Sequence, residues 1–109
     1  MSNETITAPQ GFLAAGVRCG IKIAEVPDLA LLVCERPAAA TAVFTTNRVV
    51  GSAIVHDRQV LPGGRGRLEA VVVNSGNANT CTGRRGLRDT RRMAELAGLA
   101  TDCPADRVL

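Results

Sequence analysis

The residues from Val71 to Gly83 have the chemistry of a loop in which hydrogen-bonding groups converge. Three valines are followed by Asn-Ser-Gly-Asn-Ala-Asn-Thr-Cys-Thr-Gly, a string that places three asparagines within six positions. Asparagine and glycine tolerate the left-handed backbone of tight turns, and asparagine and serine side chains cap neighbouring amides. A self-satisfied connection from a strand to a helix is the simpler interpretation. Three asparagines exceed what such a turn needs, which makes the string a candidate part of a site.

Nucleophilic catalysis by the string itself is not favoured. Ser75 needs a base within reach to act as a nucleophile, and the one histidine, His56, is distant in the sequence. Neither G-x-x-x-x-G-K-[ST] nor G-x-S-x-G occurs, which excludes a Walker phosphate loop and a hydrolase nucleophile elbow. We interpret His56, which adjoins Asp57 and Arg58, as a surface or loop histidine.

A cluster of five arginines follows the string, at Arg84, Arg85, Arg88, Arg91 and Arg92. Positive charge at the start of a helix opposes the helix dipole, at a cost of a few tenths of a kcal/mol for each residue. One interpretation is a solvated helix face on which Glu95 offsets part of the charge. The other is an anion-binding surface, for example for the phosphate of a cofactor.

The composition is that of a soluble globular chain of one small domain or part of a larger one. Apolar residues make up 46% and charged residues 21% of 109 positions, and the net charge is +3. The only aromatic residues are Phe12 and Phe44, which argues against single-strand nucleic-acid readers because these need stacking platforms. Lys22 is the only lysine.

The cysteines and the amino-terminal residues predict a cytoplasmic protein with reduced thiols. The four cysteines are far apart and form no C-x-x-C pair, so we expect no metal site. Residues 1–9 are expected to be a flexible polar lead-in without the apolar core of a signal peptide. No apolar run approaches the ~20 residues that a membrane span requires.

Strands are expected to dominate the first two thirds of the chain. Runs of apolar and β-branched residues predict them at Gly11–Val17, Leu29–Cys34, Ala38–Thr46 and Leu68–Val73. Asp28 precedes the second run, and Pro37 is expected to end it. Val49–Val55 is either another strand or an irregular crossing, and Pro62–Gly66 is a turn. The uninterrupted valines of the last run predict a strand buried on both faces.

One helix is expected, from Leu87 to about Ala100, because apolar residues recur there at helical spacing. Thr80 or Thr82 is a candidate cap, Gly98 weakens the last turn, and Pro104 prevents continuation. The final residues, 106–109, look like the start of another strand. Several strands before a single helix indicate an α+β fold.

Several blocks of the sequence together resemble the ornithine acetyltransferase / glutamate N-acetyltransferase family of arginine biosynthesis, the ArgJ family. The asparagine string is the most specific block, and Gly86, Asp89, Met93 and Ala94 continue the resemblance into the helix. The other blocks are Pro9–Phe12, Ala14–Gly16, Gly20–Lys22, Asp28–Leu31 and Val43–Asn47. The resemblance implies that residues 1–109 are one partial domain, the amino-terminal part of a four-layer α/β/β/α sandwich of the DmpA/ArgJ type.

The resemblance also implies a function. Members of this family transfer the acetyl group of N-acetylornithine to glutamate, and some also use acetyl-CoA as a donor, with no other cofactor. One precursor cleaves itself, and the threonine at the new amino terminus becomes the nucleophile; its free amine can serve as the base. The implied assembly is an (αβ)₂ heterotetramer of two α and two β chains, without nucleic-acid or membrane partners.

The catalytic residues that the resemblance implies lie beyond Leu109. The oxyanion hole belongs to an S-T-G-V-I-G motif that would begin just after that residue, and the nucleophile lies further on, so this chain alone is expected to be inactive. A supporting shell next to the missing loop is expected from Asn74, Ser75, Gly76, Asn77, Asn79, Thr45, Thr46 and Asn47. Two rival classes remain, a related self-cleaving aminopeptidase-type hydrolase and a non-catalytic binding module.

Overall fold

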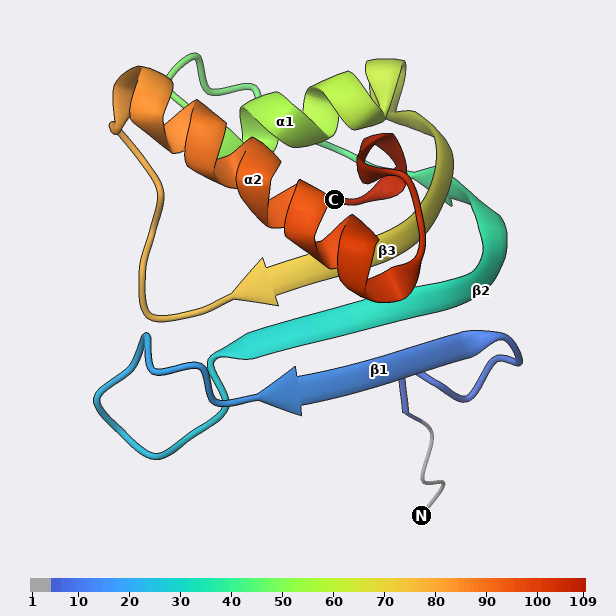
Figure 1. Ribbon diagram of the computed structural model, residues 1–109. Coiled ribbons are helices and arrows are strands. Elements are labelled where there is room, and N and C mark those ends of the chain that lie inside the picture. The colour runs from blue at the N-terminus through green and yellow to red at the C-terminus, as the bar shows by residue number, and fades with distance from the viewer. Residues whose placement is uncertain (1–4) are drawn as a thin grey trace.

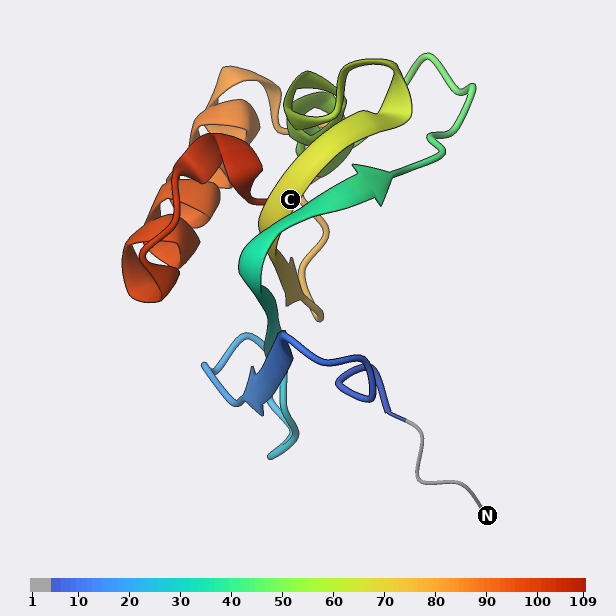
Figure 2. The same cartoon turned by 90° about the vertical axis from the view of Figure 1, so that its right-hand side faces the viewer.

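The computed structural model describes residues 5–109 as a sheet with helices on one of its faces (Figure 1). Three antiparallel strands lie in the order β1-β2-β3. Helix α2 packs against β3 and helix α1 packs against α2, whereas β1 lies away from both helices, as the rotated view also shows (Figure 2). The first four residues of the expected lead-in lie outside the described part, and residues 5–9 are exposed.

The first strand, β1, spans Phe12–Val17, close to its predicted bounds. It pairs with the first half of β2, from Phe12 opposite Cys34 to Val17 opposite Leu29. Between the two strands lies a long loop, residues 18–28.

The second strand, β2, spans Leu29–Thr41, so the prediction that Pro37 ends it was wrong. Its pairing with β3 shifts in register between Val33 and Ala38. Pro37 falls within this irregularity, where the ladder needs no hydrogen bond from the backbone N–H that proline lacks. The strand predicted at Ala38–Thr46 is therefore the second half of β2, and it stops at Thr41.

The third strand, β3, spans Arg65–Asn74 and contains the predicted run of valines. The expectation that it is buried on both faces was wrong. Ala70 is 2% exposed on the side of the helices, whereas Val73, on the opposite side, is 54% exposed. Within the described residues no second layer covers this opposite face, so successive residues of β3 lie in different environments.

A helix that the sequence analysis did not predict, α1, spans Ser52–Val60. The expectation of a strand or an irregular crossing at Val49–Val55 was wrong from Ser52 onward. Ile54, Val55 and Val60 are β-branched residues of the kind that strands favour, but the segment packs against α2, and such contacts override weak local preferences. The predicted turn follows as the short 3₁₀ helix η1, Pro62–Gly64.

The predicted helix is α2, which spans Gly83–Thr101 and starts one turn earlier than expected. Ala94 and Ala97 face the sheet and are buried. Thr82 is the residue before the first turn, but its side chain makes no capping hydrogen bond to the helix. The helix ends before Pro104, as predicted, with Asp102 in the left-handed conformation.

The last residues run along the free edge of β3. After the 3₁₀ helix η2, Ala105–Arg107, Val108 pairs in parallel with Ala70. The amide of Leu109 donates to the Ala70 carbonyl, and the Leu109 carbonyl accepts from the Val72 amide. A strand was expected to start within residues 106–109. Val108 and Leu109 pair with β3 as a strand would, whereas the residues before them belong to η2.

The hydrophobic core is small. Ala70, Ala94, Ala97 and Val108 form its buried cluster between β3 and α2, with Leu31 and Val33 of β2 among the partly buried residues around it. The helices thus cover only one end of one sheet face.

None of the helices in the part of the chain that the structure describes is long and apolar enough to span a membrane.

Candidate functional site

The asparagine string lies at the end of the sheet where β1 and β3 end and β2 begins. Two loops meet at this end, residues 18–28 and residues 75–82, on the left of Figure 1. The Ser75 amide donates to the Asp28 carbonyl at 2.9 Å and so joins the two loops. This end of the sheet is the candidate site.

Asp28 organises the first loop. Its carboxylate accepts hydrogen bonds from the backbone amides of Cys19, at 2.7 Å, of Ile21, at 2.7 Å, and of Lys22, at 2.9 Å. These amide donors, that of Cys19 first, hold the pKa of Asp28 well below its usual range. The side chain is buried, with the residue 2% exposed. From the sequence, Asp28 was recognised only as the residue before a strand, and its role in the loop was not predicted. The available signal was a carboxylate directly before an apolar run.

We predict that Asp28 makes the loop sensitive to acid. Because its pKa is lowered by folding, the ionised carboxylate stabilises the folded chain at pH values above the unfolded pKa of about 3.9, and this contribution is lost as the pH falls below it. Asp28→Asn is therefore expected to melt at a lower temperature than the wild type at pH 7, by a margin that shrinks from pH 5 to pH 3. Circular dichroism melts across this range measure the margin.

The exposed Glu25 of the same loop offers a matched control for this prediction. Glu25→Gln is expected to leave the melting temperature nearly unchanged at every pH. A difference between Asp28→Asn and the wild type that stays constant down to pH 3 would contradict the assigned role of the carboxylate.

Lys22 of the first loop packs against Gly76 of the asparagine string. Its φ is +91°, a conformation that favours glycine. A Cβ placed on Gly76 would lie 2.6 Å from Cγ and 3.4 Å from Cε of Lys22, so the lysine stem occupies the space that a side chain would need. The half-buried Lys22 is a second residue that the sequence analysis did not assign to the site.

Asn79 joins the string to both helices. Its side-chain amide donates to the Gly86 carbonyl at 2.8 Å and to the Thr90 hydroxyl at 3.0 Å. Its side-chain oxygen accepts from the Thr82 hydroxyl, and its backbone carbonyl accepts from the Ser52 amide at the start of α1. Asn79 therefore fixes the start of α2 against the start of α1, a structural role.

The other predicted site residues fall into two groups. Asn74 uses its amide to donate to the Asn77 carbonyl at 3.0 Å, whereas the side chains of Ser75 and Asn77 are exposed. The residues Thr45, Thr46 and Asn47 lie on the loop before α1, where Arg58 donates to the Thr45 carbonyl. Among the described residues no hydrogen bond joins that loop segment to residues 74–77.

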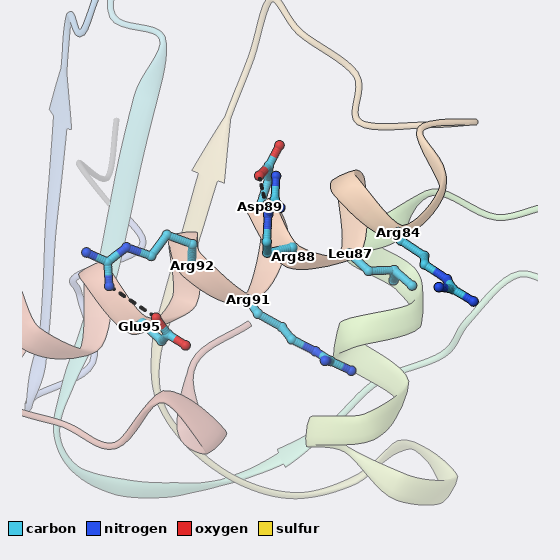
Figure 3. Close-up of a pocket in the computed structure, with 7 residues that line it drawn as sticks. All are labelled: Arg84, Leu87, Arg88, Asp89, Arg91, Arg92 and Glu95. Atoms are coloured by element: carbon cyan, nitrogen blue, oxygen red, sulfur yellow. Dashed lines mark hydrogen bonds and ion pairs between the residues drawn. The ribbon is translucent and has the colours of Figure 1, made fainter.

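Four members of the arginine cluster line an open hollow of about 510 Å³ on the outer surface of α2 (Figure 3): Arg84, Arg88, Arg91 and Arg92. Arg92 pairs with Glu95 at 3.2 Å, and Arg85 and Arg88 both lie within 4 Å of Asp89. All of these side chains are at least half exposed. For Arg85, Arg88 and Arg92, these pairs support the interpretation of a solvated face over that of an anion site.

His56 is part of α1 and half-buried, so its interpretation as a surface or loop histidine was wrong. Its Nε2 lies 2.9 Å from the carbonyl oxygen of Val108. A carbonyl only accepts, so Nε2 carries the hydrogen and donates it, which links α1 to the last strand residues. In residues 5–109 no three His, Cys, Asp or Glu side chains gather closely enough to hold a metal ion.

Comparison with known proteins decides the family. The sequence profile of the ArgJ family matches residues 13–109, nearly the whole chain. The chain belongs to the ArgJ family. This confirms the resemblance that the asparagine string and the accompanying blocks predicted.

Curated relatives share sequence with this ArgJ chain along almost all of its length. The arginine biosynthesis bifunctional protein ArgJ of Chlorobaculum tepidum is 39% identical over 108 residues, which are 99% of this chain and 26% of that protein. The chain thus spans about a quarter of the length of the curated relatives that it matches.

Two crystal structures have the same fold over this part. The arginine biosynthesis bifunctional protein ArgJ of Bacillus halodurans matches with a TM-score of 0.89 and 36% identity, over 96% of this chain and 54% of that chain. The ornithine acetyltransferase of Mycobacterium tuberculosis, complexed with ornithine, matches with a TM-score of 0.82 and 45% identity, over 94% and 55%. The mixed helix-and-strand fold of this ArgJ chain is therefore that of ArgJ structures.

Proposed function

We propose that this ArgJ chain is the amino-terminal part of an enzyme that transfers acetyl from N-acetylornithine to glutamate. The observation that carries the proposal is the match to an ornithine acetyltransferase at 45% identity and a TM-score of 0.82. Relatives of this chain bear the name of arginine biosynthesis bifunctional proteins, and acetyl-CoA is the further donor that we propose. Free thiols at all four cysteines suit a cytoplasmic enzyme.

In the proposed reaction, a threonine that self-cleavage exposes beyond Leu109 attacks the acetyl carbonyl of N-acetylornithine. The amide C–N bond breaks, the threonine becomes acetylated, and ornithine leaves with the threonine's proton. The amine of glutamate then attacks the acetyl ester, which yields N-acetylglutamate and restores the threonine hydroxyl. The free amino terminus of the threonine serves as the base.

The role that we propose for the present chain is to support that site. Asn79 holds the start of α2, Asp28 holds the two loops together, and the string between them is the shell for an oxyanion loop that follows Leu109. The exposed sheet face around Val73 is the surface that a second sheet would cover in a four-layer sandwich. The remainder of the α chain, the β chain and a second αβ pair complete the proposed assembly.

The function is tested with the longer protein in which this chain continues past Leu109. Incubation with N-acetylornithine and glutamate is expected to yield equimolar ornithine and N-acetylglutamate, measured by mass spectrometry. Residues 1–109 alone are expected to yield none. Release of free acetate without N-acetylglutamate would identify a hydrolase instead, and turnover by residues 1–109 would contradict the assignment of catalysis to the missing part.

A further inference from the structure

Two arginines of the cluster on α2 have no carboxylate partner among residues 5–109. The other three lie within 4 Å of an acidic side chain of the same helix. In contrast, Arg84 and Arg91 are exposed and form no ion pair with any residue that the structure describes. A guanidinium can form two parallel hydrogen bonds with one carboxylate. Both arginines are therefore available to an acidic partner.

Arg84 and Arg91 lie on the same side of α2, with Leu87 between them. They are seven residues apart, which is about two helical turns or ~10 Å along the helix axis. Figure 3 shows that the three side chains extend from α2 toward the same side, at the open hollow of about 510 Å³. The half-buried Leu87 thus places an apolar surface between two positive charges.

Exposed leucines continue this surface toward the end of the helix. Leu99 comes eight residues after Arg91, a spacing that places both on one face, and it is 76% exposed. Leu96 is 50% exposed. Arginine and apolar side chains are typical of the central part of protein–protein interfaces. The docking face is defined here as Arg84, Leu87, Arg91 and Leu99.

A small anion fits the docking face poorly. The residues that line the hollow all belong to α2, so among the described residues no second element encloses it, whereas sites for small ligands usually bury most of the ligand. Nucleic acid also fits poorly. Asp89 and Glu95 lie among the arginines around the hollow, and their carboxylates would repel phosphates.

A second copy of the chain is a poor match as well. It carries the same net charge of +3, and a symmetric contact would bring arginine against arginine. An acidic protein segment suits the face better, because it can combine carboxylates with apolar side chains and place a cation near Glu95. We propose that the docking face binds an acidic segment of a partner protein, whose carboxylates pair with Arg84 and Arg91 and whose apolar side chains cover Leu87 and Leu99.

The size of the docking face predicts a weak contact. From Arg84 to Leu99 the helix rises by about 22 Å, and one side of a single helix is smaller than the ~800 Å² per partner of a standard interface. We therefore expect a dissociation constant of about 10–100 μM. This inference concerns a surface that the proposed acetyl transfer does not use, and it does not rest on that function.

The experiment measures the fluorescence anisotropy of a labelled helical peptide with the longer protein in which this chain continues past Leu109. The peptide has two glutamates seven residues apart and leucines between and beyond them. Replacing both Arg84 and Arg91 with glutamine is expected to weaken binding about tenfold, and added salt is expected to reduce this difference. Leu99→Ser is expected to weaken binding about threefold to tenfold at every salt concentration.

A matched control removes two arginines from the sheet. Arg36 and Arg65 are exposed on β2 and β3, and replacing both with glutamine makes the same change in net charge. This control variant is expected to bind the peptide within about twofold of the wild type. A scrambled peptide of the same composition, with its glutamates on opposite faces, is expected to bind about tenfold more weakly than the matched peptide.

Three outcomes would overturn the docking face. Equal losses in the two double variants, or equal binding of the scrambled peptide, would reduce the contact to general charge attraction. Displacement of the peptide by duplex DNA at an equal concentration of charges would assign the arginines to nucleic acid instead. Absence of binding to the longer protein would show that this side of α2 does not receive a partner. The assay contains no substrate, so none of these results depends on whether the protein transfers acetyl.

Discussion

Val108→Asp is expected to leave the 109-residue chain largely unfolded at 25 °C. Val108 is 0% exposed and belongs to the small cluster between β3 and α2. The substitution removes about 1.5–3 kcal/mol of apolar burial. It also places a carboxylate without a partner in the core, at a cost of several kcal/mol more. Small domains have about 5–15 kcal/mol of stability in total, so the two losses together exceed what a core of this size can bear.

Far-UV circular dichroism and urea titration measure the outcome for Val108. The control makes the same chemical change at Val43, which is 99% exposed on the loop after β2. Val43→Asp is expected to stay within about 0.5 kcal/mol of the wild type. An unchanged urea midpoint for Val108→Asp would show that the cluster around Ala70 does not hold the fold together.

Gly86→Ala is expected to destabilise the chain although helix propensity alone predicts the opposite. Alanine in a helix interior is favoured over glycine by about 1 kcal/mol. At Gly86, however, a Cβ would lie 2.5 Å from Oδ1 of Asn79 and 2.6 Å from Oγ of Ser52, and it would overlap the Thr82 hydroxyl. Moving these groups apart breaks the contacts around Asn79. We expect a net loss of about 2 kcal/mol.

Thermal melts of Gly86→Ala and of a variant at an exposed position of α2 separate the steric effect on stability from the effect of helix propensity. Ala100 is exposed on the same helix, and Ala100→Gly reports the propensity difference without a steric effect. That variant is expected to lose up to about 1 kcal/mol. A gain of stability in Gly86→Ala would mean that the start of α2 is not packed against Asn79 and α1.

The elements that could be predicted from the sequence are those whose local pattern agrees with their surroundings. β1, β3 and α2 have clear periodicity or apolar runs, and the structure contains all three. α1 was missed because Val55 and Val60 favour strands locally, while its contacts with α2 and the bond from His56 to Val108 favour a helix. The prediction that the second strand ends at Pro37 was wrong for a related reason. Only the pairing with β3 shows that the strand resumes after this residue.

The candidate site was predicted in part. The composition of the asparagine string alone marked it as a candidate part of a site, and its residues lie at the end of the sheet. Asp28 and Lys22 were not assigned to it, because they come from a loop some fifty residues earlier in the sequence, and only the folded backbone places them beside Ser75 and Gly76. Thr45 shares no hydrogen bond with residues 74–77 among the described residues; its carbonyl accepts from Arg58.

Because Val108 lies near the end of the sequence, the core of this chain is completed late during synthesis on the ribosome. Synthesis releases the chain from its amino end, so all three strands of the sheet have been made by Asn74. Ala70 is covered only after α2 and then Val108 have been added. During that interval the nascent sheet exposes apolar residues on both of its faces, which is the state in which partly made proteins aggregate or bind chaperones.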